Sequence, residues 1–390
     1  MVVSIKEGNI MWTYKQPVEI IFGVDQVKLL GDFIVKKGYK NGLLISDPFF
    51  TINGMAEKIR TYADGSLNGI FTEFGPNPTI EQIDNCAEVI RTKQYNFVVA
   101  LGGGSALDCA KAACSVCKKE NSVSDYLAGA ATVSKDHIPI IAIPTTAGTG
   151  SEVTKVSVIS DPDKKVKQPL ASDNFYPEAA IIDPVLTMSL PSLVTASTGL
   201  DVLAHAIEGF WSIHHQPICD AMALHACKLV FSNLEQCCDK EKCTIENRTA
   251  MCEASVMAGI AFAYPKTSGP HACSYPLTSV YGIPHGEACA FTLDWFLRVN
   301  ATADGGRLNQ FSKDLGFQNA EMMADRILDL KKTLGLRTEF SQIGIQDKDI
   351  PEFARLCMHP NMLNNPVKMT EADIIRMCND IKKYNISKNN

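Results

Sequence analysis

Four side chains in the second half of the chain have the chemistry of a metal site. Asp201 and His205 lie four residues apart in GLDVLAHAIEGF, so in a helix they share one face. His271 and His285 stand fourteen residues apart in HACSYPLTSVYGIPHGEA. One carboxylate and three imidazoles suit Zn(II) or Fe(II). The alternative for each histidine alone is a hydrogen-bonded polar side chain, since a spacing of fourteen matches no general zinc motif.

Two loops rich in glycine and threonine have the composition of a phosphate-binding site. LGGGSALD, residues 101–108, follows an apolar run and opens a helical pattern, so its backbone N–H groups can face a pyrophosphate. It is not the GxGxxG fingerprint, and a plain glycine turn explains it equally well. PTTAGTGSEVT, residues 144–154, adds three hydroxyls, unless it is a helix-capping loop. These hydroxyls belong to Thr145, Thr146 and Thr149.

Asp47 directly follows the early apolar run GLLIS, residues 42–46. A carboxylate there can accept hydrogen bonds from ribose hydroxyls and repel a 2'-phosphate, which favours NAD over NADP. The alternative is an ordinary turn or helix cap.

Alternating strand and helix patterns predict the elements that position these residues. Apolar runs of strand type alternate with amphipathic helical stretches through the first half, which predicts a doubly wound parallel sheet. From about residue 190 long helical patterns replace the strands. We therefore expect an α/β domain over residues 1–189 and an all-helical domain over residues 190–390.

Composition narrows the class of protein. The net charge of -6 provides no basic field for nucleic acid. The sequence shows no secretory signal and no run of about 20 apolar residues, so we expect a cytoplasmic protein that does not span a membrane. The fourteen cysteines are scattered. We interpret them as core thiols rather than zinc ligands, including the pair Cys114 and Cys117.

The motifs GGGSALDCAK, PTTAGTGSEVT, DVLAHAIEGF and HACSYPLTSVYGIPHGEA occur in the order and spacing of the metal-dependent, iron-containing (group III) alcohol dehydrogenases. The chain resembles this family over nearly its whole length. The resemblance implies a dehydroquinate-synthase-like fold, with a Rossmann-like nucleotide-binding domain and a helical metal-binding domain. It also implies NAD(H), one divalent metal, and a homodimer or larger homo-oligomer.

The resemblance assigns roles to individual residues. The metal ligands are Asp201, His205, His271 and His285. The cofactor contacts are Asp47, Gly102, Gly103, Gly104, Ser105, Asp108, Thr145, Thr146, Thr149 and Lys167. In the mechanism that the family implies, the metal binds the carbonyl oxygen of an aldehyde while hydride arrives from nicotinamide.

Two departures from the family point towards the substrate. Tyr275 stands where many members carry a third histidine, and it provides either an aromatic wall or a hydrogen bond. Lys266, Thr267 and Ser268 replace a run of small residues and place one cation and two hydroxyls near His271. These groups suit an anionic aldehyde, whereas the alternative for Lys266 is a solvated surface lysine.

The segment after residue 269 looks like the branch of the family that contains sulfoacetaldehyde and phosphonoacetaldehyde reductases. We expect reduction of sulfoacetaldehyde to isethionate. The alternatives are phosphonoacetaldehyde, or a short neutral alcohol or aldehyde of the 1,3-propanediol or butanol type. More remote alternatives are a lyase like dehydroquinate synthase and a non-catalytic scaffold. The other histidines, among them His225 and His359, are interpreted as structural.

Overall fold

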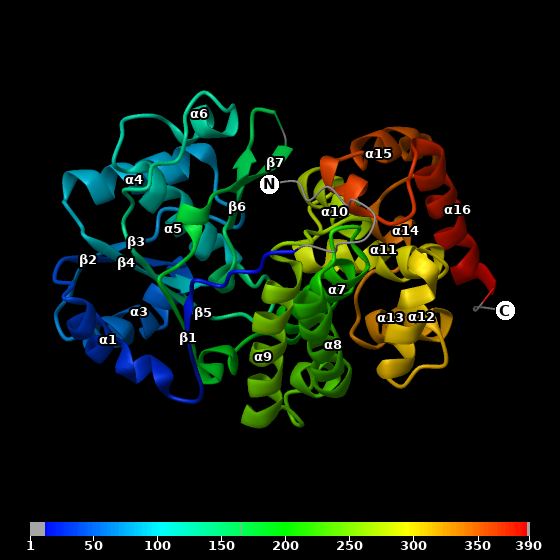
Figure 1. Ribbon diagram of the computed structural model, residues 1–390, viewed down its shortest axis with the longest axis horizontal. Helices are drawn as coiled ribbons and strands as arrows, with labels where there is room; N and C mark the ends of the chain where they lie inside the picture. The colour runs from blue at the N-terminus through cyan, green and yellow to red at the C-terminus, as the bar shows by residue number, and fades with distance from the viewer. Residues whose placement is uncertain (1–11, 165, 388–390) are drawn as a thin grey trace.

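A six-stranded parallel sheet forms the centre of the first half of the chain (Figure 1). The computed structural model describes residues 12–164 and 166–387. The strand order is β1-β8-β5-β4-β2-β3. The strands are β1 (Glu19–Phe22), β2 (Gly42–Ser46), β3 (Leu67–Phe71), β4 (Phe97–Gly102), β5 (Ile140–Pro144) and β8 (Ala179–Ile182). The predicted doubly wound α/β domain is confirmed.

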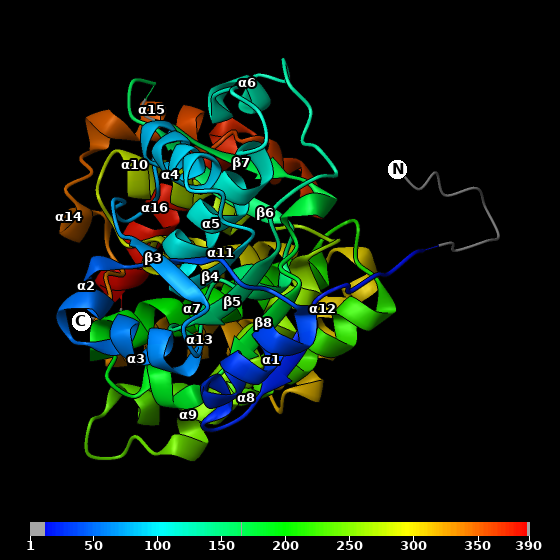
Figure 2. The same cartoon turned by 90° about the vertical axis from the view of Figure 1, so that its left-hand side faces the viewer.

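Helices cover both faces of this sheet, as Figures 1 and 2 show. Alternate residues of β4 face opposite sides, because successive side chains in a strand do. Val98 and Ala100 pack with the helices α4 (Ile80–Thr92) and α5 (Gly104–Val116). Val99 and Leu101 pack with α1 (Leu30–Lys37) and α3 (Met55–Tyr62) on the other face. The helices of this half are α1 (Leu30–Lys37), α2 (Pro48–Ile52), α3 (Met55–Tyr62), α4 (Ile80–Thr92), α5 (Gly104–Val116) and α6 (Val123–Leu127).

The carboxyl ends of three neighbouring strands bring the predicted cofactor segments together. β4 lies between β2 and β5, with Ser46 paired to Leu101 and Gly102 paired to Pro144. The loops that follow these strands therefore meet at one edge of the sheet, where open α/β sheets bind their ligands. A two-stranded antiparallel ribbon, β6 (Val156–Asp161) and β7 (Val166–Ala171), follows the threonine loop. The sequence analysis did not predict this ribbon.

The second half of the described chain is helical, and α7 lies at its centre (Figure 1). Sixteen of the 20 residues of α7 (Ser192–Trp211) are buried, because α8 (Pro217–Cys238), α9 (Ile245–Phe262) and α11 (His285–Asn300) all pack against it. The predicted boundary after residue 189 lies between the short helix η4 (Pro184–Thr187) and α7. The helices are α7 (Ser192–Trp211), α8 (Pro217–Cys238), α9 (Ile245–Phe262), α10 (Gly269–Ser279), α11 (His285–Asn300), α12 (Arg307–Asp314), α13 (Ala320–Thr333), α14 (Phe340–Ile343), α15 (Ile350–Leu356) and α16 (Glu371–Ser387).

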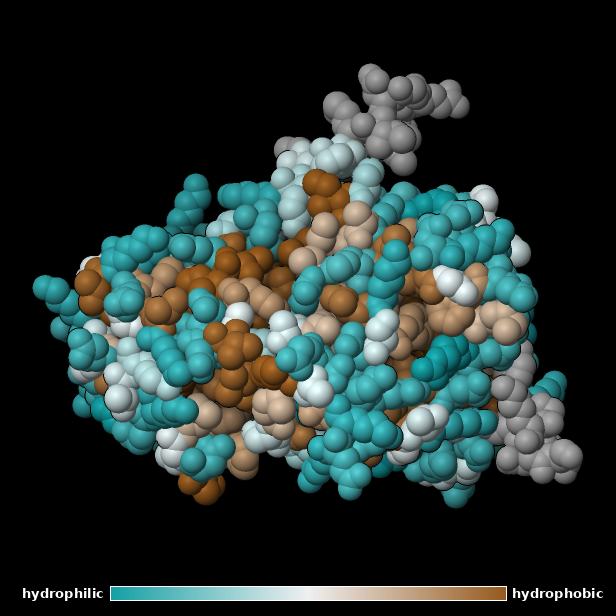
Figure 3. Space-filling view, turned by 90° about the horizontal axis from the view of Figure 1, so that it is seen from below, coloured by the Kyte–Doolittle hydropathy of each residue, from teal (hydrophilic) through white to brown (hydrophobic). Residues whose placement is uncertain are grey.

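All fourteen cysteines lie in the described part of the chain and all are free thiols, twelve of them buried. No described helix is long and apolar enough to cross a membrane. Figure 3 shows hydrophobic residues exposed between polar ones on the face seen from below. Exposed large apolar side chains include Ile20, Val24, Leu29, Val185, Met188, Leu193 and Val194.

Candidate active site

Three helices bring potential metal ligands together in the interior of the helical half. Among the described residues, one group offers a ligand atom from each of four side chains, all within 4.8 Å of one another. Asp201 comes from α7, His271 from α10, and His285 and Cys289 from α11. The Nε2 atom of His271 lies 3.6 Å from the Oδ1 atom of Asp201. This donor set suits a divalent transition metal.

His205 adjoins this group from α7. Its Nε2 atom lies 3.0 Å from Nε2 of His271, and its Nδ1 atom lies 3.8 Å from Oδ1 of Asp201. Its ring stacks on Phe262, with 4.2 Å between the centroids. All four predicted ligands therefore meet at one place, and Cys289 joins them although it was predicted only as a core thiol.

Two buried polar atoms at this place have no hydrogen-bond partner among the described residues. They are Oδ1 of Asp201 and Nδ1 of His205, on side chains that are at most 6% exposed. An unpaired buried carboxylate oxygen is costly unless a cation or donor compensates it. Burial raises the pKa of Asp201 to about 7. Burial also lowers the pKa of His205 and of His285 well below the ordinary value, which leaves neutral imidazoles ready to bind a metal.

Glu208, which the sequence analysis missed, orients His271. This fully buried carboxylate lies on α7, with Oε1 2.5 Å from Nδ1 of His271. Its Oε2 atom accepts from the backbone N–H of Ser268 at 2.6 Å. A carboxylate on the far nitrogen of a ligating histidine fixes the ring and directs Nε2 at the metal. Burial by itself opposes a charge on His271, but Cys289 and Glu208 outweigh it and raise the pKa of His271 well above the ordinary value.

A cleft of about 460 Å³ opens onto these potential metal ligands and is lined by both halves of the chain. Its walls include Asp201, His205, His271 and His285 on one side and the glycine and threonine loops on the other. The predicted cofactor residues in its lining are Gly104, Ser105, Asp108, Thr149 and Lys167. Gly102, Gly103, Thr145 and Thr146 are not among the residues that line it.

The glycine loop packs closely on the threonine loop, so that a side chain does not fit at Gly104. A Cβ atom at Gly104 would lie 2.8 Å from Cγ2 of Thr149, and one at Gly103 would lie 3.4 Å from Thr146. The backbone N–H of Thr145 donates to the carbonyl of Gly102 at 3.0 Å. Both loops are thus one unit at the amino end of α5, where N–H groups and the helix dipole favour a phosphate.

Three predicted cofactor residues already have protein partners. Asp108 accepts from the hydroxyl of Ser151 at 2.7 Å. Lys167 donates to Oδ1 of Asn77 at 2.7 Å, and burial lowers its pKa to about 8. Asp47 caps α2 by accepting from the backbone N–H of Phe49 at 2.9 Å.

The helix cap that was the alternative to ribose binding for Asp47 is therefore present in the structure. It leaves the carboxylate at the end of β2 beside Gly102, whose Cβ position would lie 3.9 Å from Cβ of Asp47.

The predicted substrate residues divide into two groups. Lys266, Thr267 and Tyr275 line the cleft, together with Asn361, which the sequence analysis missed. The side-chain amide of Asn361 donates to the hydroxyls of Thr267 at 2.9 Å and Tyr275 at 3.2 Å. Asn361 follows Tyr275 by 86 residues, so no local sequence pattern could link the two.

Ser268 faces away from the cleft, contrary to the prediction that its hydroxyl could contact substrate. The hydroxyl donates to Oε2 of Glu208 at 3.1 Å and accepts from the indole N–H of Trp211 at 2.7 Å. The side chain is completely buried and does not line the cleft. Ser268 therefore holds Glu208, because its position at the start of α10 turns it towards α7.

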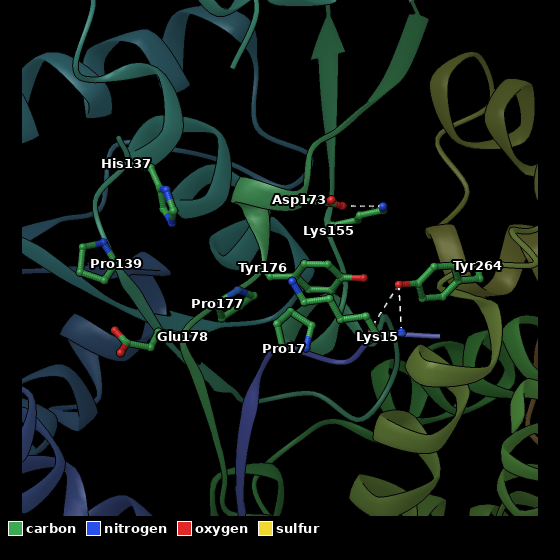
Figure 4. A pocket seen from close by; sticks show the side chains of 10 residues that line it. All are labelled: Lys15, Pro17, His137, Pro139, Lys155, Asp173, Tyr176, Pro177, Glu178 and Tyr264. Atoms are coloured by element: carbon green, nitrogen blue, oxygen red, sulfur yellow. Dashed lines mark hydrogen bonds and ion pairs between the residues drawn. The ribbon is translucent and has the colours of Figure 1, made fainter. Parts of the chain in front are cut away.

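A second cavity of about 390 Å³ lies at the edge of the α/β half, and Figure 4 shows its lining. Two of its charged groups pair with each other, because Lys155 lies 2.7 Å from Asp173. The backbone N–H of Lys15 donates to the hydroxyl of Tyr264 at 3.1 Å. The described residues place no group of metal ligands there. The cleft beside His271 is therefore the candidate active site.

The match to known proteins extends over both halves of the chain. A family model of iron-containing alcohol dehydrogenases matches residues 17–184, and the carboxyl-terminal model of the same family matches residues 195–381. The chain belongs to the iron-containing alcohol dehydrogenases. It is an oxidoreductase of the alcohol dehydrogenase and aldehyde reductase type, as the motifs around Asp201 and His271 predicted.

Solved structures and curated relatives resemble the chain over nearly its full length. The crystal structure of sulfoacetaldehyde reductase from Bifidobacterium kashiwanohense in complex with NAD+ is 46% identical, with a TM-score of 0.92 over 96% of this chain and 99% of that one. Alcohol dehydrogenase 4 of Saccharomyces cerevisiae is 30% identical, covering 95% of this chain and 98% of its own. The 1,3-propanediol dehydrogenase of Klebsiella pneumoniae is 30% identical, covering 93% and 97%.

Proposed function

We propose that this dehydrogenase uses NADH and a divalent metal to reduce a short anionic aldehyde, with sulfoacetaldehyde as the substrate and isethionate as the product. The observation that carries the substrate is a cation and a polar cluster beside the metal ligands. Lys266, Thr267 and Asn361 line the same cleft as His271. The likeness to a sulfoacetaldehyde reductase at 46% identity supports the same substrate.

The metal ligands we propose are Asp201, His205, His271 and His285. A divalent metal held there supplies electrostatic stabilisation of the negative charge that hydride addition places on the carbonyl oxygen. Glu208 keeps His271 in the required orientation. The unpaired Oδ1 of Asp201 provides the negative charge that attracts the ion.

The loops at the edge of the sheet would hold NADH. We assign the pyrophosphate to the backbone of Gly102, Gly103 and Gly104, which leads into the 13-residue helix α5. Asp47 stands at the end of β2, where its charge would repel a 2'-phosphate and favour NADH over NADPH. The remaining proposed contacts are Ser105, Asp108, Thr145, Thr146, Thr149 and Lys167.

Lys266 is the residue we assign to the sulfonate. It is exposed, and no ion pair holds its ammonium group among the described residues. Its φ of 65° is in the left-handed region, which a lysine adopts at a cost of about 1–3 kcal/mol and which is common at functional sites. Tyr275 closes the same wall of the cleft with its ring 4.4 Å from that of His359.

A comparison of aldehydes tests the proposed substrate. We expect the metal-loaded enzyme to have a kcat/KM for sulfoacetaldehyde more than about tenfold above that for propanal, a difference of about 1.4 kcal/mol. NADH oxidation measures both. Higher activity with phosphonoacetaldehyde would move the assignment to that anion. Equal or better use of propanal would leave a short-chain alcohol dehydrogenase, as the propanediol and yeast relatives are named.

Replacing Lys266 with alanine should raise KM for sulfoacetaldehyde at least about tenfold and leave propanal nearly unchanged, because a charge-assisted contact to the sulfonate is lost. Lys266→Arg keeps the cation and serves as the matched control. Equal effects of Lys266→Ala on both aldehydes would remove Lys266 from the anion site.

A further inference from the structure

Three cysteines gather at the turn between α8 and α9. Cys237 and Cys238 are the last two residues of α8, and Cys243 immediately precedes Thr244, which caps the start of α9. Of the fourteen cysteines, twelve are buried, and the two that are partly exposed are Cys238 and Cys243. The cysteines that solvent reaches most easily therefore both belong to this turn.

One guanidinium group links the two ends of the turn. Arg248, a buried residue of α9, donates from Nε to Sγ of Cys243 at 3.2 Å and from Nη2 to the carbonyl oxygen of Cys237 at 3.3 Å. Its Nη1 atom donates to the hydroxyl of Thr195 at 2.9 Å, which fixes the guanidinium in place. Reactive cysteines occur beside cations in partly exposed places, because the thiolate is the nucleophile. Cys243 occupies such a place.

Cys237 provides a second thiol next to Cys243. The two side chains hydrogen-bond to each other. The backbone N–H of Cys243 donates to the carbonyl of Asp239 at 2.9 Å, so the turn folds back onto the end of α8. Burial raises the pKa of Cys237 and of Cys238, which keeps both thiols protonated at neutral pH. A partly exposed thiol beside a cation, with a second thiol in contact, is the arrangement of redox-sensitive cysteine pairs.

We propose that Cys237 and Cys243 form a reversible disulfide when a hydroperoxide reaches the protein. The sulfur of Cys243 attacks the peroxide O–O bond and becomes a sulfenic acid, and the released hydroxide takes up a proton to give water. The thiol of Cys237 then attacks the sulfenic sulfur, and its proton leaves with the hydroxyl group as a second water. Two thiols are oxidised to one disulfide, and one hydrogen peroxide is reduced to two waters.

Peptide mapping tests this pairing. The full-length protein is reduced, freed of reductant, treated with hydrogen peroxide, alkylated and digested with trypsin, which cleaves after Lys240 and Lys242. We expect the peptides of residues 229–240 and 243–248 to be recovered as one species, lighter by two hydrogen atoms than the separate peptides. Treatment with a dithiol should separate them again.

Cys237→Ser and Cys243→Ser should each abolish the cross-linked species. Cys238→Ser is the matched control and should keep it, because Cys238 is the neighbouring thiol on the same peptide. A cross-link that survives Cys237→Ser would overturn the proposal. So would a wild-type map without the cross-link, whether Cys243 stays unmodified or is oxidised to a sulfinic acid. The wild-type map decides the case even if a variant fails to fold.

This inference is independent of the proposed function. None of the three cysteines is among the residues that line the cleft, and neither is Arg248. A protein that reduces aldehydes without forming the disulfide would lose this inference and keep the proposed function. A protein that forms the disulfide and reduces no aldehyde would do the reverse.

Discussion

Replacing His271 with alanine should lower kcat for aldehyde reduction at least about a hundredfold, since even the outer partners of metal ligands contribute about 10- to 100-fold to affinity or activity. His271 contacts Glu208 and lies beside Asp201 and His205, so its removal takes away one donor and the orientation that Glu208 provides. NADH binding should change little, because the glycine loop lies on β4 and α5 in the other half of the chain.

Three properties of the His271→Ala protein are measured together. They are its activity with NADH, its NADH binding by fluorescence titration, and its metal content by elemental analysis. His225→Ala is the matched control, because His225 is exposed on α8 and pairs with Glu253 at 2.7 Å, away from the cleft. It should behave like the wild type. Near-normal activity and metal content of the His271→Ala protein would show that the ligand assignment is wrong.

Replacing Gly286 with alanine should lower metal affinity at least about tenfold and destabilise the protein by about 1–3 kcal/mol, as overpacked interiors do. Gly286 lies where α11 begins and crosses α7. A Cβ atom there would lie 2.1 Å from the carbonyl oxygen of Ser197 and 2.9 Å from Cβ of Asp201. Because the backbone of α7 cannot yield, α11 must move away and carry His285 from Asp201.

Competition with a chelator measures the metal affinity, and thermal unfolding measures the stability. Gly75→Ala is the matched control, since no atom lies within 4 Å of its Cβ position. A Gly286→Ala protein that binds metal as tightly as the wild type would contradict the close contact between α7 and α11.

Local sequence patterns correctly predicted the secondary-structure elements that depend on the spacing of neighbouring residues. The buried strand at residues 42–46 and the helix that carries Asp201 and His205 are both present. Their apolar periodicity is strong, and four residues make about one helical turn. The same rule applied to His285 and Cys289 would have placed both side chains on one face of a helix, but the abundance of cysteines favoured packing. The buried Glu208 in the apolar helix HAIEGF was a similar signal that was not used.

Contacts between segments that are far apart in the chain could not be predicted from local sequence patterns. Nothing near Asn361 indicates that its amide meets Thr267 and Tyr275. The orientation of Ser268 depends on how α10 starts against α7 and could not be deduced from its neighbours. The homo-oligomer that the family implies stays a prediction, and a mass measurement in solution would decide it.

The central claim is that the metal ligands and the nucleotide loops work on one substrate in one cleft. Its most direct test is NADH oxidation by the chelator-treated protein in the presence of sulfoacetaldehyde and, separately, propanal. We predict almost no oxidation until Zn(II) or Fe(II) is added back, and metal-dependent turnover with at least one aldehyde afterwards. Equal turnover before and after metal addition, or no oxidation with any aldehyde in the metal-loaded protein, would contradict the account.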